Sequence, residues 1–174
     1  MSGILDWFLS IPAAYPELRL ELLGGLLLAT VLGGAIGWER EHSQKPAGLR
    51  TNILICVAAT LLTDLSVMAA AAATGPADPG RIAAQIVTGV GFLGAGTIIQ
   101  SRGTVTGLTT AATLWVVAAI GMAVGFGAWI EAAGTTLLVL MTLIPLRRFE
   151  ERVQARRGGR RATDKQPEPE TEPS

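Results

Sequence analysis

Cysteine and histidine are almost absent from this chain of 174 residues, which contains one of each, Cys56 and His42. A single cysteine excludes an intrachain disulfide, and with it a small secreted domain held together by such bonds. One histidine and one cysteine inside a separate apolar run supply too few ligands for a zinc or iron site. No nucleophile has a general base beside it, so we expect no hydrolytic catalysis and predict that the protein is not an enzyme.

Charge is scarce as well, at 16% of residues against 49% hydrophobic residues. Only five of the fourteen lysines and arginines lie between residues 20 and 146, whereas eight lie between Arg147 and Lys165. A helix of about 20 apolar residues spans the roughly 30 Å of bilayer hydrocarbon, and several runs here have that length. We therefore predict an all-α bundle of five transmembrane helices.

The five expected crossings are residues 20–38, 53–73, 81–100, 108–126 and 128–146. Residues 4–15 are apolar but too short to cross, and their aromatic side chains predict a short helix lying at the membrane interface. Residues 1–19 are then a periplasmic or interfacial segment without the pattern of a cleavable signal. Residues 147–174 should form a cytoplasmic tail that is first basic and then disordered.

The distribution of lysine and arginine predicts the orientation, because cytoplasmic loops carry the excess of positive charge. With the amino terminus outside, the cytoplasmic face collects twelve: Arg40, Lys45, Arg50, Arg102 and the eight of the tail. The outer face collects two, Arg19 and Arg81. We predict an external amino terminus and a cytoplasmic carboxyl terminus, with the basic tail near anionic lipid. Nucleic acid is not an expected partner.

Residues 81–115 are expected to form the compact core of the bundle, two crossings joined by a short polar hinge at Arg102. The first is dense in glycine, which lets helix backbones approach closely in lipid: Gly89, Gly91, Gly94 and Gly96. The second carries hydroxyls that can bond to a neighbouring helix: Thr109, Thr110 and Thr113. Glycine faces on the first, third and fourth crossings favour a homodimer.

The sequence from Gly89 to Gly94, GVGFLG, matches the dinucleotide-binding fingerprint. That motif requires a preceding strand, whereas this copy lies inside an apolar run of membrane length. The glycines therefore indicate helix packing, and we expect no bound cofactor.

Glu39, Glu41 and His42 follow the first crossing, with Glu39 and His42 on one helical face. Mg²⁺ accepts one or two carboxylates and keeps its waters, so Glu39 or Glu41 is a weak candidate ligand. The alternative is a charged loop in which these carboxylates balance Arg40 and Lys45.

Asp64 lies near the middle of the second crossing, where a carboxylate is costly and should face the bundle. Expected neighbours are Thr60 and Thr63 on its own helix, and Gln85 or Thr88 on the third. Asp64 is either part of an ion or proton site, and so a weak Mg²⁺ candidate, or a protonated, hydrogen-bonded structural residue.

Arg50 and Asn52 lie where the chain re-enters the membrane after the first loop. Arg50 either anchors the helix at the headgroups or pairs with Glu39 or Glu41 and closes the bundle. Arg81 and Gln85 mark the outer end of the third crossing in the same way.

Four stretches resemble the MgtC/SapB family of bacterial inner-membrane proteins: GGAIGWERE (33–41), KPAGLRTN (45–52), GRIAAQIVTGVGFLGAGTII (80–99) and GLTTAATLWVVAAIGM (107–122). Their order and spacing fit, and they are spread over most of the span from residue 20 to residue 146. The matching residues are Glu39, Arg40, Gly48, Leu49, Arg50, Thr51, Asn52, Arg81, Gln85, Gly91, Gly94, Gly96, Thr110 and Trp115.

The resemblance implies a five-crossing inner-membrane protein linked to growth at low Mg²⁺ and, in pathogens, to survival in macrophages. It also implies a regulator that restrains the F-type ATP synthase rather than carrying Mg²⁺. Three departures concern the virulence-associated branch of the family. The chain has a charged tail where many relatives carry an ACT-like domain, Val116 replaces a branch cysteine after Trp115, and Asp64 is not part of the pattern.

We therefore expect a membrane-embedded regulator of Mg²⁺ homeostasis that contacts another membrane protein. The alternative is a Mg²⁺ or proton transporter or channel lined by Asp64, Gln85, Asn52 and Thr110. A third hypothesis is a structural membrane subunit without ion chemistry.

Overall fold

The computed structural model describes residues 16–73, 78, 80–101 and 103–144, with side chains from Leu20 onward. The surface helix predicted at residues 4–15, Arg102 of the predicted hinge, and the tail at 147–174 lie outside the described residues.

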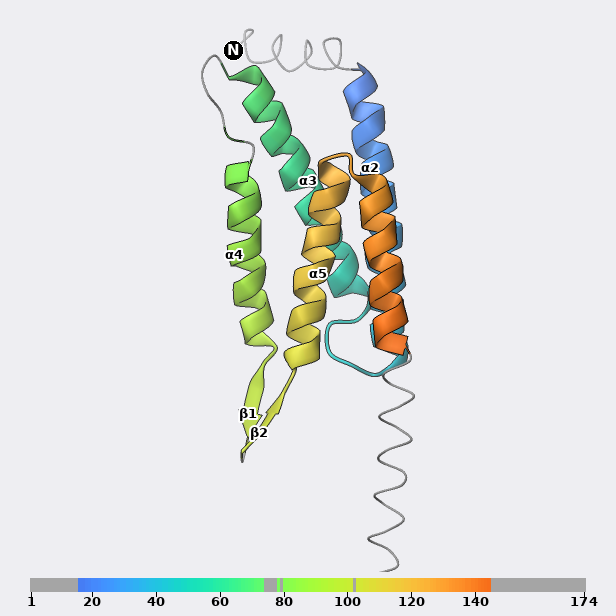
Figure 1. The fold of residues 1–174 in the computed structure, drawn as a ribbon, viewed down its shortest axis with the longest axis vertical. Coiled ribbons are helices and arrows are strands. Elements are labelled where there is room, and N and C mark those ends of the chain that lie inside the picture. The colour runs from blue at the N-terminus through green and yellow to red at the C-terminus, as the bar shows by residue number, and fades with distance from the viewer. Residues whose placement is uncertain (1–15, 74–77, 79, 102, 145–174) are drawn as a thin grey trace, which may run out of the picture.

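Five helices make up most of the described part of the chain, and they run alternately up and down (Figure 1). They are α2 (Pro16–His42), α3 (Leu49–Ala72), α4 (Gly80–Gly96), α5 (Leu108–Gly125) and a final helix, Trp129–Ile144. The predicted five-helix, all-α bundle is confirmed, apart from one small hairpin.

Three of the helices are long and apolar enough to cross a membrane: Leu20–His42 within α2, α3 and α5. The Trp129–Ile144 helix is apolar but shorter, and the 17 residues of α4 rise about 26 Å. Many large apolar side chains face outward, including Ile130 at 85% and Phe92 at 81% exposed. A surface of this kind suits lipid or a protein partner rather than water.

Glycines on α2 bring that helix against the backbone of α3. A Cβ added at Gly33 would lie 2.8 Å from the Asn52 carbonyl oxygen, and one at Gly37 would lie 2.7 Å from the Leu49 Cα. Both distances are too short for any side chain. The four-residue spacing of the two glycines therefore lets the two helices pack at backbone contact.

Glycines on α5 do the same on another side of α3. A Cβ at Gly125 would lie 2.6 Å from the Thr60 carbonyl oxygen, and one at Gly121 would collide with the Cys56 carbonyl. The α3 helix is thus held between α2 and α5. The core cluster at this junction includes Ile36, Cys56, Val117 and Ile120, so Cys56 acts there as a small buried hydrophobic residue.

The expectation that the glycines crowd α4 on several sides is wrong within one chain. A Cβ added at Gly94 would lie 3.5 Å from the Ala111 Cβ of α5, whereas one added at Gly89, Gly91 or Gly96 would meet no atom within 4 Å. The predicted homodimer rested on glycine faces of three crossings. Gly33 and Gly37 on α2 and Gly121 and Gly125 on α5 are used inside the chain, whereas α4 keeps three glycines that adjoin open space, Gly89, Gly91 and Gly96.

The connection between α4 and α5 is a β-hairpin and not the predicted polar hinge. The α4 helix ends at Gly96 rather than Gln100, and β1 (Ile99–Ser101) pairs antiparallel with β2 (Thr104–Thr106). The glycines at its turn and exit, Gly103 and Gly107, have φ of 81° and 89°, a region that glycine enters readily. The hairpin projects from the end of the bundle where α2 ends and α5 begins (Figure 1).

Candidate functional site

The candidate residues fall in three separate places. One is the bundle end that carries the hairpin, where Arg40 lies; another is a groove between α3 and α4; the third is a cavity near the opposite end, where Asp64 lies. The alternative transporter hypothesis placed Asp64, Gln85, Asn52 and Thr110 along one pathway, and none of these three cavities contains all four residues.

Arg40 is a buried cation at the end of the core. Its side chain is 4% exposed, and its Nη2 donates to the hydroxyl of Thr110 on α5 over 3.1 Å. The expected bond from an α5 hydroxyl to a neighbouring helix thus occurs at Thr110. Thr113 instead donates to the Thr109 carbonyl of its own helix at 2.8 Å. The bond between Arg40 and Thr110 links α2 to α5 beside the hairpin.

The carboxylates of Glu39 and Glu41 make different hydrogen bonds. One carboxylate oxygen of Glu39 accepts from the Ser43 hydroxyl at 2.6 Å, and the other is buried without a hydrogen-bond partner. Glu41 accepts from the backbone N–H of Leu49 at 2.9 Å and so caps the start of α3. The contact with Leu49 therefore identifies Glu41 as a helix cap.

Asn52 holds the loop between α2 and α3. Its fully buried Nδ2 donates to the carbonyls of Ala47 (2.6 Å) and Gly48 (2.9 Å). Two loop residues, Gln44 and Ala47, have positive φ of 51° and 59°, which side chains other than glycine adopt at a cost. The amide therefore fixes a loop that would not keep this shape unaided.

Arg50 and Thr51 are exposed at the start of α3. No carboxylate lies within ion-pair distance of Arg50 among the described residues, so its expected pairing with Glu39 or Glu41 is wrong. Arg81 is likewise exposed, at the start of α4 on the opposite end. The other expectation for both arginines, an anchor at the headgroups, stays a prediction.

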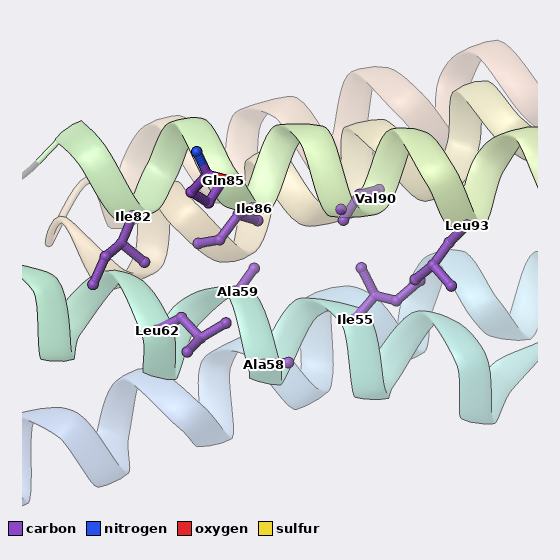
Figure 2. Close-up of a pocket in the computed structure, with 10 residues that line it drawn as sticks. Ile55, Ala58, Ala59, Leu62, Ile82, Gln85, Ile86, Val90 and Leu93 are labelled. Atoms are coloured by element: carbon purple, nitrogen blue, oxygen red, sulfur yellow. The ribbon is translucent and has the colours of Figure 1, made fainter.

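Gln85 lies in an apolar groove of about 410 Å³ between α3 and α4 (Figure 2). Facing apolar side chains line it from the two helices: Ile55, Ala59 and Leu62 from α3, and Ile82, Ile86, Val90 and Leu93 from α4. Gln85 makes no hydrogen bond to the described residues and is exposed. Its expected approach to Asp64 is wrong, as is that of Thr88, whose hydroxyl donates to the Ala84 carbonyl.

Asp64 lines a cavity of about 290 Å³ with Glu21, Thr60 and Trp129. The cavity lies between α2, α3, α5 and the final helix, and one carboxylate oxygen of Asp64 is buried there without a hydrogen-bond partner. Thr60 is a neighbour, as expected, although its hydroxyl donates to the carbonyls of Cys56 and Gly121. Glu21, which is exposed near the start of α2, is the second carboxylate of this wall.

The three weak Mg²⁺ candidates do not form one metal site. Glu39 and Glu41 lie at the hairpin end of the bundle, and Asp64 lies in the cavity near the other end. Among the described residues, no group of three or more histidine, cysteine, aspartate or glutamate side chains is placed to hold a metal ion.

Several residues that line these cavities were not singled out from the sequence. Thr97, Thr106 and Thr142 lie with Arg40 at the hairpin end. Runs of β-branched residues before and after Gly103, at Ile98 and Ile99 and at Thr104–Thr106, are a signal for the hairpin that brings Thr106 there. Thr142 carries no local signal, because only packing places it beside α2.

The four motif stretches lie within the part of the chain that is similar to a known protein family. The model of the MgtC family matches residues 26–152. The protein MgtC of Salmonella typhimurium is 48% identical over 128 residues, which cover 74% of this chain and 53% of that protein. A protein of Escherichia coli K12 named putative magnesium transporter YhiD is 46% identical over 127 residues, covering 69% of this chain and 59% of that protein.

An uncharacterized protein of Haemophilus influenzae is 39% identical over 141 residues, which cover 78% of this chain and 59% of that protein. This chain thus spans little more than half the length of the curated relatives it matches. No solved structure shows significant similarity to it. From the family match and the identity to these relatives, the chain belongs to the MgtC family.

Proposed function

We propose that this protein is a membrane-embedded regulator of Mg²⁺ homeostasis that supports growth or survival at low Mg²⁺. It acts by contact with another membrane protein of the bacterial inner membrane, and it is not an enzyme. The link to Mg²⁺ draws on the family and on one relative's name, putative magnesium transporter.

The observation that carries the proposal is the buried guanidinium of Arg40. A divalent cation moving from the Asp64 cavity to the hairpin end would first have to pass the tightly packed core around Ile120 and Val117. It would then meet a buried positive charge that has no carboxylate within ion-pair distance among the described residues. Charge repulsion at low dielectric makes this a poor exit for Mg²⁺ and favours a role in contact over a role in transport.

In this proposal, the regulator binds its partner through the exposed face of α4. This helix leaves Phe92 81% exposed and has open space at Gly89, Gly91 and Gly96. Small residues with open space allow another helix to approach closely in lipid. The family resemblance makes the F-type ATP synthase the first partner to test, and a second copy of this chain would bind through the same helix.

The test measures ATP-driven proton pumping in inverted membrane vesicles with and without the protein. We expect the protein to lower pumping and to co-purify with the synthase. Gly91→Leu should remove both effects without unfolding the chain, because the added side chain meets open space. Gly134→Leu is the matched control on the final helix, since it too adjoins open space and should change nothing. Unchanged pumping with the folded wild-type protein would contradict the proposal.

The second candidate is a Mg²⁺ or proton transporter, favoured by one observation: the two carboxylates, Asp64 and Glu21, in the wall of one cavity. It is tested by Mg²⁺ and proton flux into liposomes that contain the purified protein or its Asp64→Asn variant. Flux that disappears in a folded variant would replace the regulator with a transporter. No flux from folded, inserted wild-type protein would eliminate the transporter.

A further inference from the structure

The cavity at the hairpin end has a volume of about 510 Å³ and differs in chemistry from the α3–α4 groove. Its wall contains two cations, Arg40 and Lys45, and a set of threonine hydroxyls from the hairpin, α5 and the final helix: Thr106, Thr109, Thr110 and Thr142. The regulator proposed above uses only the buried charge of Arg40 and does not account for the other donors of this wall. Its composition calls for a separate explanation.

The buried charge of Arg40 is only partly satisfied. The Arg40 side chain is only 4% exposed. Its Nη2 donates to the Thr110 hydroxyl, and its Nε is buried without a hydrogen-bond partner. No carboxylate of the described residues lies within ion-pair distance of it. Glu39 is the nearby negative charge that acts on Arg40, but it lies beyond ion-pair distance. The buried guanidinium therefore keeps an unused donor that an added anion could accept from.

The start of α5 adds a second source of positive potential to the same wall. Gly107 is its N-cap, with φ of 89°, and provides no side-chain cap. Residues 107–110 line the cavity, so the uncapped end of an 18-residue helix opens onto it. Unsatisfied N–H groups and the helix dipole at such an end favour bound anions.

One negative charge opposes the two cations. Glu39 lies in the wall, with one oxygen bonded to the Ser43 hydroxyl and the other buried without a partner. Arg40, Lys45 and the α5 terminus together outweigh it, which leaves the cavity positive. These donors come from α2, from the α2–α3 loop and from the start of α5, and together they suit an anion with several acceptor oxygens.

We propose that this cavity binds the phosphate group of an anionic ligand, with Arg40, Lys45 and the start of α5 as its donors. The group belongs either to a soluble phosphate that enters from the cytoplasmic side or to the headgroup of an anionic lipid. Both sources fit the wall, because apolar side chains of Ile99, Val105, Leu108 and Leu143 adjoin the polar ones.

The experiment uses the full-length protein in nanodiscs of phosphatidylcholine and follows its thermal unfolding. Inorganic phosphate and glycerol phosphate are titrated as soluble probes, and a second set of nanodiscs contains phosphatidylglycerol. We expect a saturable rise in Tm with the probe of the true source. A rise with soluble phosphate identifies a soluble ligand, and a rise confined to phosphatidylglycerol identifies a lipid headgroup.

Variants connect the effect to the cavity. Lys45→Gln removes an exposed cation of the wall and should weaken the apparent affinity by roughly tenfold, the value of one charge-assisted contact. Glu39→Gln removes the opposing charge and should strengthen it. Arg50→Gln, an exposed cation at the same end but outside the cavity wall, is the control and should leave the affinity unchanged.

Arg40→Gln should abolish binding, and if that variant fails to fold, the Lys45 and Glu39 variants decide. No saturable response to any probe would overturn the proposal. So would an Arg50→Gln effect as large as that of Lys45→Gln, because binding would then reflect surface charge and not this cavity.

Discussion

At the scale of single residues, the buried polar side chains mostly stabilise helix junctions. Asn52 bonds two carbonyls of the α2–α3 loop, Arg40 bonds Thr110, and Thr60 bonds the Gly121 carbonyl of α5. Each contact joins elements far apart in the sequence or holds a turn in an unfavourable conformation. In lipid no water replaces such a bond, so these residues are structural first.

Replacement of Asn52 by alanine should therefore destabilise the protein. The Ala47 carbonyl would lose its side-chain donor and the Gly48 carbonyl would keep only the backbone N–H of residue 52, at a cost of about 1–3 kcal/mol. The free energy of unfolding can be measured by SDS titration in mixed micelles with circular dichroism. Gln85→Ala is the control, since that amide is exposed and makes no bond to the described residues. An equal loss in both variants would refute the structural role of Asn52.

At the scale of elements, glycine has two different uses in this bundle. On α2 and α5 it permits backbone contact with α3, and on α4 most of it adjoins open space. The same residue type at similar spacing thus packs helices inside the chain in one case and leaves a surface in the other.

This difference predicts opposite outcomes for one substitution. Gly125→Ala would place a Cβ 2.6 Å from the Thr60 carbonyl oxygen and should destabilise the fold by about 1–3 kcal/mol through overpacking. Gly91→Ala meets no atom within 4 Å and should be neutral or stabilising by up to about 1 kcal/mol, because alanine is the better helix former. Both can be measured by the same SDS titration, and equal effects would contradict the packing described.

At the scale of the whole molecule, the bundle has two chemically different ends. The hairpin end carries Arg40, Lys45 and Arg50, and the opposite end carries Arg81 and the Asp64–Glu21 cavity. This arrangement agrees with an orientation in which the hairpin end is cytoplasmic, which stays a prediction.

Cysteine labelling in intact cells tests that orientation. The background is Cys56→Ala, because the native cysteine is buried and should be removed without a new polar group. A membrane-impermeant maleimide should label Ala73→Cys at the outer end but should label Thr104→Cys only after the cells are opened; both positions are exposed. Labelling of Thr104→Cys in intact cells would invert the predicted topology.

Much of the fold could be predicted from residues 20–146. Apolar runs separated by charged or glycine- and proline-rich connections indicated five helices, and four motif stretches indicated the family. The predicted end of the third crossing, at residue 100, was wrong because residues 97–100 are as apolar as the helix before them. The chain leaves the helix after Gly96, and Ile99–Ser101 pair with Thr104–Thr106; such a pairing depends on a turn rather than on hydropathy.

The candidate site was less predictable. Asp64 was correctly expected beside Thr60, since both lie one turn apart on one helix, whereas its expected contact with Gln85 was wrong. Local spacing determines which residues share a helical face, but not which neighbouring helix that face meets. Glu21 and Trp129 line the same cavity as Asp64, from helices that no sequence pattern assigned to it.

By itself, the sequence determined the class of the molecule, its family and the positions of its charges, because hydropathy and motifs are properties of contiguous residues. Only the tertiary structure decided which glycines are buried, that Arg40 bonds Thr110, and that the hairpin end encloses a cavity. These features depend on how helices far apart in the chain pack together. That packing is the sum of many weak contacts, none of which leaves a local signal.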